Sequence, residues 1–165
     1  MGNINVYRDK CRLIISNREG VKLLLSIFEI FPLNSTKYLD FLCFKKAFSI
    51  YQSRKGLNTE VLTKTILELK DSMNSKRVDS VMPVDHKINI TKGWLLGYLE
   101  GDGSFSLDRN NLTPAFSLAA TVEQDLLFNK IKEYLYNEFF FNDEYSLFKL
   151  KLGKAILIIS LCWGP

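Results

Sequence analysis

Histidine and paired cysteines are almost absent from this chain of 165 residues. His86 is the only histidine, and the three cysteines, Cys11, Cys43 and Cys162, lie far apart in the sequence. These counts argue against a Cys/His metal site and against a histidine-based catalytic triad. They fit free thiols in a reducing compartment better than a disulfide framework.

Long hydrophobic runs are missing as well. The longest uncharged apolar run, 155–162, is too short to cross a bilayer, so we expect no membrane span. We also identify no signal or transit peptide at the N-terminus. The 22 Lys and Arg against 18 Asp and Glu give a net charge of +4, which suits a polyanionic partner without specifying one.

Apolar residues are plentiful. They make up 47% of the chain, with 12 Phe and 7 Tyr, and this content is typical of a globular protein with a core. The bias toward Ile, Leu, Phe, Asn, Lys and Tyr is what an AT-rich genome encodes. We therefore expect a mitochondrial protein encoded in the organelle.

The segment 93–105 is the most informative. Its pattern predicts a helix that Thr91 caps, that ends at Gly103 and that leads directly into a strand. Gly97 and Gly101 lie four residues apart on one face, where each costs about 1 kcal/mol relative to alanine. A bare face of this kind favours close approach of a second helix. The predicted helix–helix interface consists of Trp94, Gly97, Tyr98 and Gly101.

Two carboxylates, Glu100 and Asp102, fall at the C-terminal end of this predicted helix. The helix dipole disfavours negative charge at that end. Residues that break a local rule are candidates for function. The plain alternative is a Glu-Gly-Asp-Gly turn that ends the helix and serves folding alone.

The nine residues Leu-Leu-Gly-Tyr-Leu-Glu-Gly-Asp-Gly at 95–103 resemble the signature helix of the LAGLIDADG homing endonucleases. The resemblance implies two such helices packed face to face, each delivering one carboxylate to the divalent metal ions that cleave DNA. It assigns the catalytic and Mg²⁺-binding role to Asp102, with Glu100 as a second metal-binding candidate.

Most of the remaining chain also resembles this family. The resemblance implies an α/β fold of the α+β type, with antiparallel sheets covered by helices in two incomplete pseudo-symmetric halves. We read 1–74 as the C-terminal half of a first repeat, 75–90 as a linker and 91–165 as the N-terminal half of a second repeat. The apolar run Leu13, Ile14 and Ile15 is expected to be a buried strand.

The predicted DNA-facing strand positions carry mostly short uncharged side chains. They are Ser104, Ser106, Asp108, Ala115, Ser117, Ala119 and Thr121. Where many family members have a glutamine near the active site, this sequence has Ala119 or Ala120. Candidate phosphate contacts are the basic residues Arg8, Lys10, Arg12, Arg109, Lys149, Lys151 and Lys154. Basic side chains that only solubilise strand edges are the alternative.

Residues 1–165 hold one signature helix, whereas the chemistry of the family needs two carboxylates. Our main hypothesis is a structural RNA-binding subunit of an organellar ribonucleoprotein such as the mitochondrial ribosome, with RNA ranked ahead of DNA. The alternative is one fragment of a split endonuclease, or of an intron maturase, completed by a second polypeptide that carries the missing helix. A nuclease formed by self-association is the third explanation. Mg²⁺ is expected only where nuclease activity survives.

Overall fold

A computed structural model describes residues 2–56, 58–107, 109, 114–139, 148–152 and 157–162. The chain divides into two compact units. The first unit comprises Met1–Leu33 with Lys37–Asp79, and the second comprises Asn34–Thr36 with Ser80–Pro165. Among the described residues, no helix is both long enough and apolar enough to cross a membrane.

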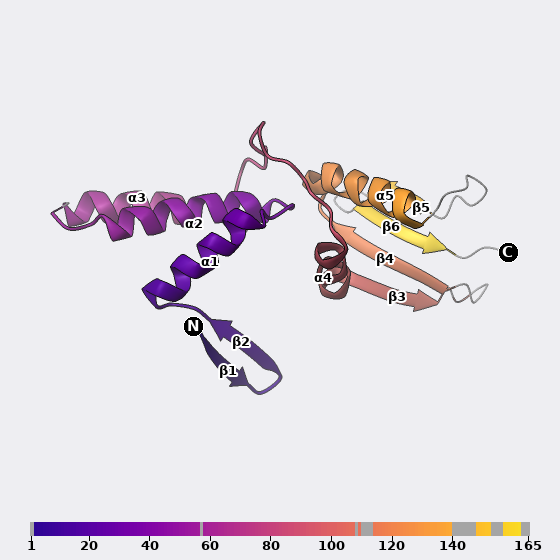
Figure 1. The fold of residues 1–165 in the computed structure, drawn as a ribbon, viewed down its shortest axis with the longest axis horizontal. Helices are drawn as coiled ribbons and strands as arrows, with labels where there is room; N and C mark the ends of the chain where they lie inside the picture. The colour runs from indigo at the N-terminus through magenta and orange to yellow at the C-terminus, as the bar shows by residue number, and fades with distance from the viewer. Residues whose placement is uncertain are drawn as a thin grey trace. The chain divides into compact units, whose positions relative to one another are not determined.

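The first unit is a β-hairpin followed by three helices (Figure 1). The hairpin pairs β1 (Asn3–Tyr7) with β2 (Lys10–Ile14), and α1 (Arg18–Ile30), α2 (Lys37–Gln52), α3 (Thr59–Asp71) and the short 3₁₀ helix η1 (Asn74–Lys76) follow. Asn17 and Asn58 cap α1 and α3: their side chains accept hydrogen bonds from the backbone N–H groups of Gly20 and Glu60. Helices α2 and α3 run antiparallel, side by side.

The second unit consists of α4 (Lys92–Asp102), β3 (Gly103–Leu107), β4 (Pro114–Ala120), the short 3₁₀ helix η2 (Val122–Gln124), α5 (Asp125–Phe139), β5 (Phe148–Leu152) and β6 (Leu157–Cys162). The four strands form one antiparallel sheet in the order β3-β4-β6-β5. Figure 1 shows α5 lying along this sheet. The predicted α+β fold with antiparallel sheets and covering helices is confirmed.

A continuous core lies between α5, α4 and the sheet. Its buried members are Leu95, Leu118, Leu127, Phe128 and Ile131, and Phe128 and Ile131 are fully buried. Ile88 and Ile90 pack against this cluster, so the end of the segment predicted as a linker contributes to the core. Asn34 is 3% exposed, and its side-chain amide exchanges two hydrogen bonds of 2.9 Å with the backbone of Asn89.

The expectation of a buried strand at residues 13–15 is wrong for the first two positions. Leu13 is 65% exposed and Ile14 is 36% exposed. The register places Ile4 opposite Leu13 and Val6 opposite Cys11, so these four residues share one face of the hairpin. An apolar sequence forms the strand locally, but burial requires a second layer, and none of the described residues supplies one to this face.

Candidate functional site

Helix α4 begins and ends as its sequence predicts. The Thr91 hydroxyl accepts a hydrogen bond of 3.2 Å from the backbone N–H of Trp94 and so caps the first turn. The helix ends at Asp102, and the backbone N–H of Gly103 donates to the carbonyl of Leu99. Strand β3 follows without a loop. Asp102 is therefore held between two regular elements.

One side of α4 faces the core of its own unit. Leu95 is 5% exposed, and Trp94 and Tyr98 stack on each other with ring centroids 4.9 Å apart. Both rings pack against the core cluster. Burial, together with the negative charge of Asp102 one turn away, raises the pKa of Tyr98 to about 12. The phenol therefore stays protonated at neutral pH, and the two aromatic residues have an intramolecular role in addition to the predicted interface role.

The adjacent side of α4 is bare. A Cβ atom built on Gly93, Gly97 or Gly101 would meet no described atom within 4 Å. These positions are spaced four apart and are exposed, and Leu96 beside them is 60% exposed. None of the described residues therefore requires glycine at Gly97 or Gly101 for space. The assignment of Gly97 and Gly101 to a helix–helix interface remains a prediction, and this open face is consistent with it.

Gly103 is required for a different reason. Its φ of −79° is open to any residue, so it is not the left-handed position that usually selects glycine at a helix end. A Cβ atom there would lie 2.2 Å from the Leu99 carbonyl oxygen and 2.5 Å from the ring of Phe116. The close approach of α4 to β4 therefore excludes a side chain.

The two carboxylates of α4 do not converge. Both Glu100 and Asp102 are exposed, and residues two apart in a helix point roughly 200° away from each other around the axis. Within the described residues, no three His, Cys, Asp or Glu side chains gather at one place. A carboxylate oxygen is the kind of ligand that Mg²⁺ prefers, but Mg²⁺ needs several oxygens in octahedral geometry. Glu100 and Asp102 therefore do not form a metal site with each other in the described residues, and the metal-binding role of each remains a prediction.

The sheet register settles which strand residues share a face. Ser104 lies opposite Ser117, and Ser106 lies opposite Ala115. Ser104, Ser106 and Ala119 are exposed, whereas Leu118 on the other face is 1% exposed under α5. Ala119, and not Ala120, therefore lies on the open face, which resolves the ambiguity of one residue in the sequence. No charged side chain lies on this face at the described positions of β3 and β4.

The predicted basic contacts fall in three places. Arg8, Lys10 and Arg12 are exposed on the β1–β2 hairpin, and Arg109 is exposed beyond β3. In the register, Lys149 lies opposite Ser160, which lies opposite Ser117, so Lys149 belongs to the serine face of the sheet. Lys151 lies opposite Ile158, and Ile158 lies opposite Ala119, so Lys151 belongs to the same face. Lys154 and Asp108 lie outside the described residues.

Sequence reasoning missed one feature of the first unit. The guanidinium of Arg54 lies 4.0 Å from the centroid of the Tyr51 ring, in a cation–π contact. The spacing of three residues at the end of a helix is the sequence signal that could have indicated this pair.

Comparisons with known proteins agree with the fold. A family model described as LAGLIDADG endonuclease matches residues 1–48. A protein of Schizosaccharomyces pombe named "Probable intron-encoded endonuclease Cox1-I1b" is 33% identical over 138 residues, which cover 82% of this chain and 33% of that protein. The chain therefore spans about a third of the length of this curated relative.

Solved structures show the same fold at low identity. The meganuclease I-CpaMI, bound to uncleaved DNA, has a TM-score of 0.74 and 19% identity over 99% of this chain and 61% of its own. A mutant of I-SmaMI has a TM-score of 0.76 and 18% identity over 98% of this chain and 60% of its own. The homing endonuclease I-GzeII, in complex with its DNA target, has a TM-score of 0.63 and 18% identity. The match covers 98% of this chain and 73% of the I-GzeII chain.

These comparisons support the endonuclease or maturase alternative better than they support the ribosomal RNA-binding subunit. LAGLIDADG endonucleases use divalent metal ions, which agrees with the family-based expectation of Mg²⁺. With the family-model match in the first unit and the aligned relative, the chain belongs to the LAGLIDADG homing endonuclease family.

Proposed function

We propose that residues 1–165 form part of a LAGLIDADG DNA endonuclease, or of an intron maturase derived from one, in which α4 is one of two signature helices. The observation that carries this proposal is the combination on α4 of a bare glycine face and an exposed Asp102 at its end. The second helix comes from another chain or from a segment outside these residues. It packs on Gly97 and Gly101 and brings a second carboxylate close to Asp102.

Asp102 has a defined role in this proposal. It supplies one carboxylate to a divalent ion shared with the second helix, and a bound ion of this kind activates water and neutralises charge on the scissile phosphate. Tyr98, one turn from Asp102, is an uncharged phenol at neutral pH, and burial moves its pKa further from neutrality, to about 12. The Tyr98 ring stacks on Trp94, and both residues pack α4 against the core.

The nucleic-acid partner follows from the same proposal. The structural relatives named above include meganucleases bound to DNA, which supports DNA as the substrate. The serine face of the sheet and Lys149 and Lys151 at its β5 edge would lie along the duplex. Mitochondrial location is part of the proposal and is supported by the composition and by the intron-encoded relative.

One observation favours the RNA-binding subunit as a second candidate. The described positions of β3 and β4 on the open face lack the charged and amide side chains that read base edges. A family member that retains the fold without reading DNA would have such a surface. In that case Asp102 has no metal to hold and serves only the end of the helix.

The test is Asp102→Asn in the protein completed by its second signature helix. We expect Mg²⁺-dependent cleavage to fall by roughly 10²-fold or more, with assembly unchanged in sedimentation. Glu100→Gln is the matched control, because Glu100 lies on the other side of the helix, and it should retain cleavage. Unchanged cleavage by the Asp102→Asn protein would contradict the proposal and favour the second candidate.

A further inference from the structure

The turn between α2 and α3 is surrounded by basic side chains. We call Lys46, Arg54, Lys55 and Lys64 the basic end of this helical hairpin. All four are exposed, and none of them forms an ion pair with a described residue. In residues 41–67, Glu60 is the single acidic residue. Glu60 and Glu68 lie one helical turn before and after Lys64 and offset part of this charge, and the end keeps a net positive charge.

The opposite end of the same two helices is different. There Arg77 donates to Asp40 at 2.8 Å, and Lys37 lies 3.4 Å from the same carboxylate. Lys76 pairs with Asp71. Lys22 and Lys45 are also paired, with Glu19 and Glu29. At the Asp40 end Arg77, Lys37 and Lys76 therefore each have an acidic partner, whereas no ion pair with a described residue involves the four side chains of the basic end.

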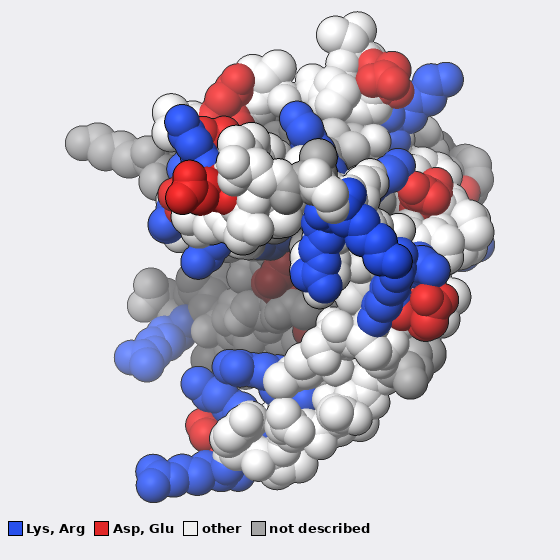
Figure 2. Space-filling model, turned by 90° about the vertical axis from the view of Figure 1, so that its left-hand side faces the viewer, with Lys and Arg blue, Asp and Glu red and all other residues white. Residues whose placement is uncertain are grey.

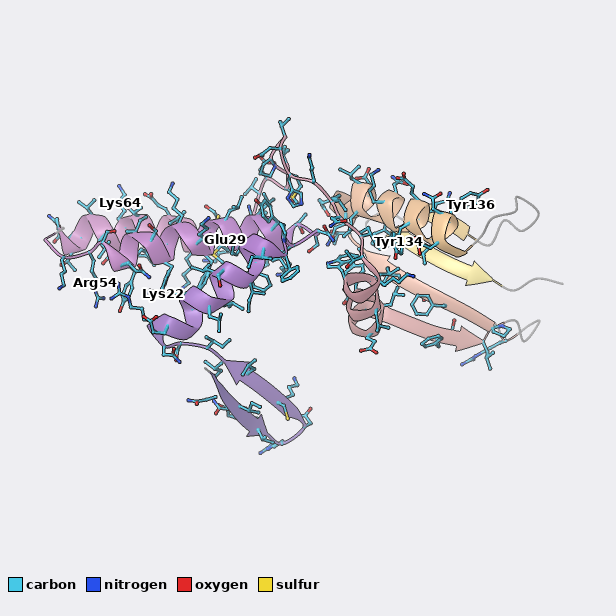
Figure 3. All side chains as sticks on the ribbon, in the orientation of Figure 1. Lys22, Glu29, Arg54, Lys64, Tyr134 and Tyr136 are labelled. Atoms are coloured by element: carbon cyan, nitrogen blue, oxygen red, sulfur yellow. The ribbon has the colours of Figure 1, made fainter. Side chains whose placement is uncertain are left out.

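The four residues lie close together along the helix axes. Lys46 is six residues before the end of α2, and Lys64 is five residues after the start of α3. At about 1.5 Å per residue, all four lie within roughly 10 Å of the turn. In Figure 3, Arg54 and Lys64 point to opposite sides of the hairpin. Figure 2 looks from this side of the molecule and shows a group of blue side chains facing the viewer.

Arg54 is oriented by an aromatic neighbour. Its guanidinium lies 4.0 Å from the centroid of the Tyr51 ring, and Tyr51 is 45% exposed. The contact holds an unpaired cation next to an accessible aromatic face. Basic side chains next to exposed aromatic rings are typical of surfaces that bind nucleic acids. Phosphate groups would supply the negative charge that this end lacks.

We propose that the basic end binds the phosphodiester backbone of a nucleic acid, as a contact surface separate from α4 and from the sheet face. The inference goes beyond the proposed function, since it involves neither the metal site nor base recognition. Each lysine that neutralises a phosphate releases counterions, so the contact must show in the salt dependence of binding.

The experiment measures binding of the full 165-residue chain by fluorescence anisotropy between 50 and 200 mM KCl. The probes are a labelled 30-base-pair DNA duplex of arbitrary sequence and a labelled 30-nucleotide RNA. The variant is the triple substitution Lys46→Gln, Lys55→Gln and Lys64→Gln. The matched control, Lys22→Gln, Lys76→Gln and Lys130→Gln, removes the same charge from lysines that are ion-paired.

For each lysine that meets a phosphate, the slope of log K against log salt should fall by about 0.9 for duplex DNA or 0.7 for single-stranded RNA. Binding to DNA at 0.1 M KCl should weaken by roughly tenfold per contact. Weaker binding of the triple variant to DNA alone, to RNA alone or to both supports the proposal and identifies which nucleic acid the basic end contacts. An equal loss in the control, an unchanged slope, or no salt-dependent binding by the unaltered chain would overturn it. A negative result would overturn the role of the basic end alone, because the Asp102→Asn cleavage test of the proposed function does not depend on it.

Discussion

The two units of this chain are stabilised in different ways. The second unit contains fully buried apolar side chains, with Leu118, Phe128 and Ile131 at 1% exposure or less. In the described part of the first unit, the most buried apolar residues, Val21, Leu39 and Phe41, are 7–8% exposed. Its most connected polar residue is Asp40, which binds Arg77, Lys37 and the backbone N–H of Asn74. The second unit therefore has a core of its own, and the first depends more on polar contacts between helices.

The largest expected effect is loss of the central ring of the second unit. Phe128→Ala should reduce the free energy of unfolding by about 3–5 kcal/mol, because a fully buried phenyl ring leaves a cavity. Phe41→Ala is the matched change in the first unit and should cost less, since the Phe41 residue is 7% exposed and loses less buried surface than Phe128. Hydrogen exchange followed by mass spectrometry localises each loss. Equal costs would remove the contrast between the units.

Features that depend on neighbouring residues in the chain could be predicted from the sequence, and features that depend on packing between distant segments could not. The α4 pattern, its Thr91 cap and the strand that follows were predictable because neighbours in the chain determine them. The exposure of Leu13 was not predictable, since it depends on whether another layer covers the hairpin. The choice between Ala119 and Ala120 required the pairing of β4 with β3 and β6, which is a nonlocal property.

At the candidate site, too, the sequence predicted the local features and the structure added those that depend on packing. The motif identified Asp102 and its place at the end of a helix, and the structure adds that Glu100 points to another side of that helix. Sequence alone explained Gly103 as a helix stop. The physical cause is instead the Leu99 carbonyl and the Phe116 ring, which leave no room for a side chain. The carbonyl belongs to the last turn of α4 and is a local constraint, whereas the Phe116 ring comes from β4 and depends on the packing of the sheet.

The second prediction concerns the polar contacts of the first unit. Burial tends to raise the pKa of Asp40, but hydrogen bonds from Arg77, Asn74 and Lys37 outweigh it, and the pKa is lowered. Since the folded pKa lies below the unfolded value of about 3.9, the carboxylate stabilises the fold fully above that pH. The stabilisation is lost as the pH falls through the folded pKa.

Asp40→Asn should therefore lower the free energy of unfolding at pH 7 by about 2 kcal/mol and flatten its dependence on acid pH. Denaturant titrations from pH 7 to pH 3 measure both effects. The control is Asp71→Asn, because the pair of Asp71 with Lys76 is exposed and contributes less. If both variants behaved alike, the Asp40 cluster would not hold α2 to the segment after α3.

The smallest effect is expected on the open face of α4. Gly97→Ala should raise the free energy of unfolding of the isolated chain by up to about 1 kcal/mol, because alanine favours the helix and the new methyl group meets no described atom. The same change at Gly103 should lower stability, since its methyl group would collide with a backbone carbonyl. Thermal unfolding measures both. In the completed protein, Gly97→Ala should weaken packing of the second helix while leaving the second unit folded. A destabilised isolated chain would mean that this face is already covered, and the basis for a second signature helix on Gly97 would be lost.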